Sequence, residues 1–284
     1  GPILRAAIAA PNTLVYNLVR QEIGASQSPY SLVSRLFRRH PAIHFTRPYH
    51  ALIDDSVVTL LQQEPHWQIQ DIPQTAIRHD GYRQAAIAAR NKATTARLAM
   101  ERFLAENPGD PYVYSKLGAL YLDLDRPTYG IELLERGLKA TPLPPSIAYE
   151  LHYHLGIAYG RMKCVSQAAY HYEQAIQQPL LPTLKIGAHT NLGSLRQAVG
   201  DREGAKQEFE AVVALAPDLA MGHYNLGMVK RAMGDLAGAI ASYQQAILLQ
   251  PNYADAHQNL GVAWLKTGNI TAGLDAFRQA IALH

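Results

Sequence analysis

Cysteine is almost absent from this chain, since Cys164 is the single one among 284 residues. One cysteine cannot form a disulfide within the chain, and proteins without disulfides are typical of reducing compartments. Long apolar runs are missing as well: no stretch approaches the roughly 20 apolar residues that span a bilayer. We therefore expect a cytoplasmic protein with no membrane span.

An excess of charge of one sign is also lacking. The formal net charge is +3, and residues 111–284 contain 14 Lys and Arg against 14 Asp and Glu, so the small excess lies in residues 1–110. A nucleic-acid-binding surface needs basic residues clustered along one face. We expect no nucleic-acid partner. The hydrophobic content of 48% is that of a folded chain with a sizeable core.

The first part of the chain, residues 1–82, has short apolar runs between turn-forming residues. Runs of this kind, rich in β-branched and aromatic residues, predict strands; they are Leu14-Val15-Tyr16, Leu32-Val33 with Leu36-Phe37, and Ile43 with Phe45. Apolar residues at helical spacing predict a helix over residues 56–63. We interpret residues 1–82 as a small α+β segment.

The following stretch has a different composition. Residues 84–106 contain Ala, Arg, Leu and Met but neither Gly nor Pro, which predicts a helix of about six turns. We therefore assign residues 83–110 to a linking helix.

The rest of the chain repeats with a fixed period. Leu226-Gly227 recurs 34 residues later as Leu260-Gly261, and the same interval separates Tyr243 from Phe277. A period between 20 and 50 residues indicates a solenoid, in which each unit buries its apolar face against its neighbours.

The repeated unit resembles the tetratricopeptide repeat, which has Leu-Gly at its seventh and eighth positions and small residues at its twentieth and twenty-seventh. Five matches begin with Leu117-Gly118, Leu155-Gly156, Leu192-Gly193, Leu226-Gly227 and Leu260-Gly261. The resemblance implies a mainly α fold, with a right-handed α-solenoid of five helix pairs over residues 111–284. The repeats would cover about 111–144, 149–182, 186–219, 220–253 and 254–284. Pro-rich insertions at Leu143-Pro144-Pro145 and at residues 179–182 lengthen the first two connections and predict stiff loops.

A second set of motifs precedes the repeats. An Arg-Leu-Phe-Arg segment at residues 35–38 is followed by an Ile-x-His-x-Gly-Tyr turn at 77–82 and an Asn-Pro-Gly-Asp-Pro junction at 107–111. In this order they resemble the C-terminal part of a bacterial family 2 glycosyltransferase that continues into tetratricopeptide repeats, over residues 12–110. The resemblance implies that His50 and His79 are transferase remnants. The nucleotide-sugar-binding half of such an enzyme is not among these 284 residues, so we expect the chain not to be catalytic alone, and whether its parent protein is a glycosyltransferase stays open.

Three asparagines provide a candidate binding surface. Asn191, Asn225 and Asn259 lie 34 residues apart at the sixth position of the last three repeats. An amide side chain both donates and accepts hydrogen bonds, so a column of asparagines can hold the main chain of an extended peptide. The nucleocytoplasmic O-linked N-acetylglucosamine transferases resemble this pattern, which implies a peptide in the concave groove. The alternative is that Asn is simply a frequent residue at this position.

Other predicted peptide-binding residues are Tyr224, Arg231, Tyr153 and Arg161, because Tyr and Arg are enriched at interfaces.

We expect no cofactor and no metal, since His152 and His154 would point in different directions from one helix. The predicted function is a protein or peptide interaction module, and the alternative is a stand-alone scaffold or assembly factor. Homo-oligomers through the N-terminal segment or the uncapped C-terminal helix are a further expectation.

Overall fold

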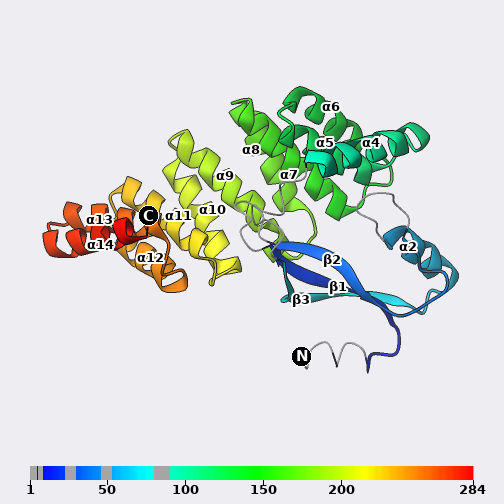
Figure 1. Ribbon diagram of the computed structural model, residues 1–284, viewed down its shortest axis with the longest axis horizontal. Coiled ribbons are helices and arrows are strands. Elements are labelled where there is room, and N and C mark those ends of the chain that lie inside the picture. Colours follow the sequence, from blue (N-terminus) through cyan, green and yellow to red (C-terminus); the bar gives the residue numbers. More distant parts are fainter. Residues whose placement is uncertain (1–4, 6–8, 23–29, 46–52, 80–89, 284) are drawn as a thin grey trace. The chain divides into compact units, whose positions relative to one another are not determined.

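A computed structural model describes residue 5 and residues 9–22, 30–45, 53–79 and 90–283 (Figure 1). The chain divides into two compact units, Gly1–His154 and Leu155–His284, which we describe separately. Their boundary lies within one helix, α7 (Pro145–Arg161). The division of the chain at residues 82 and 110 stays a prediction.

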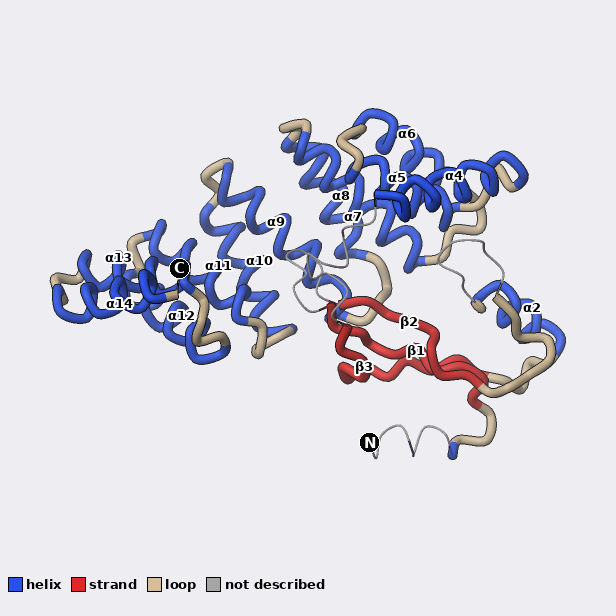
Figure 2. The backbone as a smooth tube through the Cα atoms, in the orientation of Figure 1, coloured by secondary structure: helices blue, strands red, loops and turns tan. Residues whose placement is uncertain are grey.

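The first unit begins with a three-stranded sheet in the order β2-β1-β3 (Figure 2). Strand β1 (Thr13–Glu22) is central; it pairs antiparallel with β2 (Tyr30–Phe37) and parallel with β3 (Gln68–His79). Most residues of β1 are buried, including its neighbouring side chains Leu14 and Val15. A nearly continuous apolar run is typical of a strand that is covered on both faces.

Helix α2 (Asp54–Gln63) lies at one end of the sheet, where Val57 and Leu60 pack against Leu14 and Val15 (Figure 1). This confirms the helix predicted over residues 56–63. The strand predicted at Ile43 and Phe45 is wrong. The Ile43 N–H donates to the His40 carbonyl at 3.0 Å in a turn, and Ile43 packs against the core formed by α2 and β1.

Proline is accommodated in β3 by an irregularity of the ladder. Leu18 of β1 pairs with Ile72, but the next residue, Val19, pairs with Thr75, so Pro73 lies in a register shift. A residue without an N–H is tolerated there because no ladder bond is lost. His79 ends β3 opposite Glu22. Residues 77–79 of the turn expected at 77–82 are the last residues of β3, while residues 80–82 and His50 lie outside the described residues.

The helical part of the chain follows the predicted period. Its helices are α4 (Arg90–Glu106), α5 (Pro111–Asp123), α6 (Pro127–Leu138), α7, α8 (Val165–Gln177), α9 (Ile186–Ala198), α10 (Arg202–Leu215), α11 (Ala220–Met233), α12 (Leu236–Leu249), α13 (Ala254–Lys266) and α14 (Ile270–Ala282). From α5 onward they form five pairs, each with a first and a second helix (Figure 1). The mainly α solenoid with a small sheet segment before it is thereby confirmed.

The two Pro-rich insertions are partly helical, which differs from the stiff loops that we predicted. Pro145 starts α7, where a missing N–H does not matter, and Pro182 starts a short 3₁₀ helix that ends at Lys185. The first helix of the second repeat therefore has 17 residues, against 13 for α5.

The Leu-Gly positions allow the two helices of a pair to approach closely. A Cβ atom at Gly227 would lie 2.7 Å from Tyr243 Cε1, and one at Gly261 would lie 3.0 Å from Phe277 Cε1. Both distances are shorter than nearly all real Cβ contacts, so a larger residue would push the ring away in a closely packed interior. Gly on a first helix and an aromatic residue on the second are therefore matched parts of one contact.

Helix α4 has a larger role than that of a linker. Ala96 and Met100 are buried against α5, in a cluster with Tyr112, Leu117 and Tyr121. Ala96, Met100 and Pro108 precede Gly130, Leu134 and Pro142 by one period of 34 residues. Helix α4 thus occupies the place of the second helix of a preceding repeat and covers the first end of the array.

Candidate functional site

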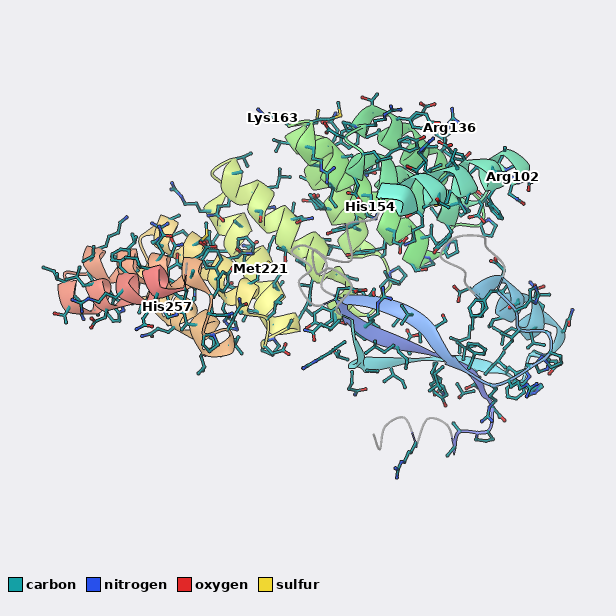
Figure 3. The ribbon with its side chains drawn as sticks, viewed as in Figure 1. Arg102, Arg136, His154, Lys163, Met221 and His257 are labelled. Carbon is teal, nitrogen blue, oxygen red and sulfur yellow. The ribbon has the colours of Figure 1, made fainter. Side chains whose placement is uncertain are left out.

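The candidate site lies in the second unit, on the first helices α9, α11 and α13. Asn191, Asn225 and Asn259 occupy equivalent positions on these helices, and each is half-buried. We call these three residues, together with Tyr224, the asparagine surface. Figure 3 shows the side chains of this region and labels Met221 on α11 and His257 on α13.

Asn259 is held in a defined orientation. Its Nδ2 donates to the Tyr224 hydroxyl at 3.1 Å and to the main-chain carbonyl of Asp255 at 3.0 Å. A carbonyl can only accept, so the atom that faces it is the amino nitrogen, and both of its hydrogens are used. The remaining polar atom of Asn259, Oδ1, is an acceptor.

The Tyr224 bond also connects two repeats, because Tyr224 belongs to α11 and Asn259 to α13. Around it lie two more tyrosines: the Tyr253 ring centroid is 4.9 Å from that of Tyr224, and the Tyr243 centroid is 6.0 Å away. Burial raises the pKa of Tyr253 to about 12, with contributions from Tyr224 and Asp255. Burial likewise raises the pKa of Tyr224 and of Tyr243. At neutral pH these three phenols are uncharged and keep their hydrogens for donation.

Arg231 and Met228 extend the site along α11. Arg231 Nε donates to the Tyr243 hydroxyl at 3.4 Å, and the cation partly offsets the effect of burial on the pKa of Tyr243. Met228 and Trp264 pack, partly buried, on the apolar cluster between α12 and α13. The surface therefore combines amides, phenols and apolar side chains, a mixture that is suited to a peptide.

The other two predicted binding residues, Tyr153 and Arg161, differ in accessibility. Tyr153 is only 6% exposed and stacks on Tyr149, with ring centroids 5.8 Å apart and an interplanar angle of 8°. Little of Tyr153 is left for a partner to contact. Arg161 is exposed at the end of α7.

At the sixth position of the repeat, the first repeat has a lysine in an ion pair, whereas the last repeat has an asparagine. Lys116 takes the sixth position on α5, and its Nζ lies 2.7 Å from both carboxylate oxygens of Glu150 on α7. Ser115 donates to the same carboxylate at 3.0 Å. Burial opposes the charged form of Glu150, but Lys116, His154 and Ser115 outweigh it and hold the pKa of Glu150 below its ordinary value. Lys116 and Ser115 therefore both donate to the Glu150 carboxylate on the neighbouring first helix.

Sequence reasoning missed a polar network in the third repeat. Arg196 of α9 binds Glu208 on α10 at 2.8 Å and Glu173 on α8 at 3.0 Å, and His189 Nδ1 lies 2.7 Å from Glu208. Arg196 stands where three other repeats have the aromatic residues Tyr121, Tyr159 and Trp264, so its charge was an available signal.

A second missed feature is a contact that recurs at the start of three first helices, α5, α11 and α13. His223 and His257 bind the carbonyls of Pro217 and Pro251, six residues earlier, at 2.9 and 3.0 Å. Tyr114 donates to the Pro108 carbonyl at 2.9 Å in the same way. These side chains fix the loops between repeats.

Among the residues that the structure describes, no three His, Cys, Asp or Glu side chains gather as a metal site, and no helix is long and apolar enough to cross a membrane.

Comparisons with known proteins agree with this architecture. Residues 186–219 match the tetratricopeptide repeat model, and residues 227–268 match a TPR repeat model. The chain therefore contains tetratricopeptide repeats. A TPR repeat-containing protein from Synechococcus elongatus is 40% identical over 214 residues, which cover 75% of this chain and 53% of that protein. The match is longer than the five repeats, so it reaches into the residues before Pro111, and the chain spans about half the length of this curated relative.

Two solved structures show the same fold at low identity. MamA from Desulfovibrio magneticus is 21% identical with a TM-score of 0.54, over 61% of this chain and 94% of that one. YrrB is 19% identical with a TM-score of 0.55, over 66% of this chain and 92% of that one, and is described as a TPR protein with an unusual peptide-binding site.

Proposed function

We propose that this chain is a protein-interaction module and that an extended peptide binds across α9, α11 and α13 at the asparagine surface. The observation that supports this most directly is the orientation of Asn259. Tyr224 and the Asp255 carbonyl take both amide hydrogens, so Oδ1 is available to accept an N–H from a peptide main chain. The peptide-binding site described for YrrB, which shares the fold, is consistent with this role.

Recognition of a peptide main chain requires that the ligand bind in an extended conformation. Asparagines on neighbouring first helices, which pack roughly 8–10 Å apart, would contact peptide groups about three residues apart in an extended main chain. Met228 and Arg231 lie beside them on α11. Affinity would then depend on an extended main chain more than on one side chain, as in other modes that read peptide backbones. Arg161, which is exposed, would extend the contact, whereas the buried Tyr153 would not contact the peptide.

The test uses peptides selected from a displayed random library by the wild-type chain. We expect the triple replacement of Asn191, Asn225 and Asn259 by Ala to lower affinity by at least about 10-fold, from the loss of hydrogen bonds of about 1 kcal/mol each. Gln244→Ala, which removes an exposed amide from the second helix α12, is the matched control and should not change affinity. Failure to select any peptide, or equal affinity of the triple variant with unchanged helicity, would refute the proposal.

The finer role within a parent protein is also a proposal. The resemblance of residues 12–110 to a glycosyltransferase segment supports a module that recruits an acceptor or partner for such an enzyme. The parallel pairing of β1 with β3 is in keeping with this, because parallel strands occur mainly in α/β sheets. A stand-alone scaffold is the alternative. The coding sequence upstream separates the two: an α/β domain with an Asp-x-Asp site supports the transferase, and a nearby start codon excludes it.

A further inference from the structure

Arg231 is a half-buried cation beside the asparagine surface. Tyr224, Met228 and Arg231 are separated by four and three positions, so they lie along one face of α11. Burial and Asp255 raise the pKa of Tyr224, and Arg231 acts in the opposite direction. The guanidinium is therefore within electrostatic reach of the hydroxyl that binds Asn259. A ligand held by Asn259 would lie near a positive charge.

Most of the hydrogen-bonding capacity of Arg231 is unused within the described chain. Its Nε donates to the hydroxyl of Tyr243, a fully buried residue, at 3.4 Å, and this contact fixes the guanidinium on the helix pair. Among the described residues, none accepts a hydrogen bond from the two Nη nitrogens, and no carboxylate forms an ion pair with Arg231. The outer edge of the guanidinium, which carries several N–H donors, is thus available to a ligand.

A second arginine of the same unit shows what such a group binds. The Arg196 side chain is 25% exposed, and its Nη1 and Nη2 lie 2.8 Å from Glu208 and 3.0 Å from Glu173. Partial burial deprives a cation of water, and hydrogen bonds to carboxylates compensate for that loss. Arg231 is also half-buried but has no described carboxylate, so a carboxylate from a ligand would complete the same arrangement.

The nearby acid belongs to a different part of the site. Asp255 lies in the first turn of α13, whereas Arg231 lies in the last turn of α11, and the two form no ion pair. A negative charge on a ligand is repelled near Asp255 and attracted near Arg231. Side chains of an extended peptide advance by about 3.3 Å per residue and alternate in direction, so every second one can face α11.

We propose that Arg231 binds the carboxylate of an Asp or Glu side chain in the bound peptide, so that the asparagine surface selects acidic extended peptides. This inference rests on the proposed function, because Asn259 and its equivalents have to hold the main chain. Main-chain contacts accept many sequences, whereas the planar guanidinium matches a carboxylate with two parallel hydrogen bonds. Arg231 thereby adds a charge preference to a surface that reads the backbone.

Selection from the displayed random library tests the charge preference. We expect peptides selected by the wild type to share an Asp or Glu at one position, and those selected by Arg231→Glu to be enriched in Lys or Arg instead. Lys230→Glu is the matched control, because Lys230 is half-buried, has no ion pair with a described residue and lies about 100° around the same helix. It should keep the acidic preference. Wild-type peptides without a shared acid, or equal changes in both variants, would overturn the proposal.

Synthetic peptides with amidated C-termini locate the contact. Replacing the shared acid by its amide should weaken binding to the wild type by at least about 10-fold, but should change binding to Arg231→Gln by less than about 2-fold, since the partner is gone. Circular dichroism checks that the variant stays helical. Equal losses in the two proteins would refute the contact, and peptides that bind only with a free C-terminus would assign Arg231 to a terminal carboxylate and refute the side-chain proposal.

The triple replacement of the asparagines separates this inference from the proposed function. If only the inference fails, that variant still loses affinity for the selected peptides, while Arg231→Gln binds them as the wild type does. If the triple variant binds as the wild type does, the proposed function fails, whatever charge the peptides carry. If no peptide is selected, both fail.

Discussion

The sixth position of the first helix carries Lys116 in the first repeat and Asn259 in the last, and the comparison separates packing from binding. Both side chains reach the neighbouring first helix: Lys116 binds Glu150 on α7, and Asn259 binds Tyr224 on α11. The Lys116 ammonium group can only donate hydrogen bonds, and it donates to both carboxylate oxygens of Glu150. Asn259 uses its two hydrogens in the same kind of contact but keeps an acceptor oxygen. A side chain at the sixth position can thus connect two repeats in either case, but only the asparagine keeps a hydrogen-bond acceptor for a ligand.

The largest expected effect tests the helix contact of the repeat that carries Tyr224, the partner of Asn259. Gly227→Ala would place a methyl group 2.7 Å from Tyr243 Cε1 and displace α11 from α12, so we expect a loss of about 3 kcal/mol in the free energy of unfolding. Chemical denaturation measures it. Gly160→Ala, where nothing lies within 4 Å, is the control, and it should stabilise the helix by up to about 1 kcal/mol. Similar behaviour of the two variants would mean that the close approach does not matter.

A smaller effect is expected at Lys116. Lys116→Met leaves the Glu150 carboxylate without its cation, and we expect a loss of about 2 kcal/mol at neutral pH. Arg136→Met breaks the exposed Arg136–Glu132 pair on α6 and should cost less than about 0.5 kcal/mol.

The same pair predicts a dependence on pH. Because the folded pKa of Glu150 is below its ordinary value, the stabilisation from its charge is complete above about pH 4.3 and is lost as pH falls through the lowered folded pKa. Thermal unfolding between pH 7 and pH 3 should show this loss in the wild type and not in Lys116→Met. Parallel curves for the two proteins would show that the pair is not the cause.

The smallest effect tests the orientation of Asn259. Tyr224→Phe removes the oxygen that accepts one amide hydrogen, and we expect a loss of about 1 kcal/mol in stability and a several-fold loss of peptide affinity. Tyr253→Phe leaves both Asn259 bonds in place and serves as the control. If peptide affinity falls equally in both, the rings matter rather than the amide.

Some features of the fold were predictable because they depend on short spacings. The 34-residue interval fixed the helix pairs, and the Leu-Gly positions marked where a side chain would collide with Tyr243 or Phe277. The role of α4 was also readable, since Ala96 and Met100 stand in register with Gly130 and Leu134. Composition alone, with neither Gly nor Pro over residues 84–106, predicts a helix there but does not show that it packs on α5.

Other features could not be read from local patterns. Ile43 and Phe45 look like a strand, but the Ser56 hydroxyl, on α2, accepts from the His44 N–H and competes with any ladder. Tyr153 has the spacing of an exposed residue, and its burial depends on Tyr149, one turn earlier. The network around Arg196 joins three helices, and no sequence interval shows that their side chains converge.

The sequence by itself determined the periodic helices, the small residues at the helix contacts and the positions of the three asparagines, because each follows from residue type and spacing along one chain. Only the tertiary structure decided which polar groups have hydrogen-bond partners within the chain. Whether Lys116 meets a carboxylate and whether Asn259 keeps an acceptor oxygen depend on distances between helices. Hydrogen bonds and apolar contacts form only where those distances allow them.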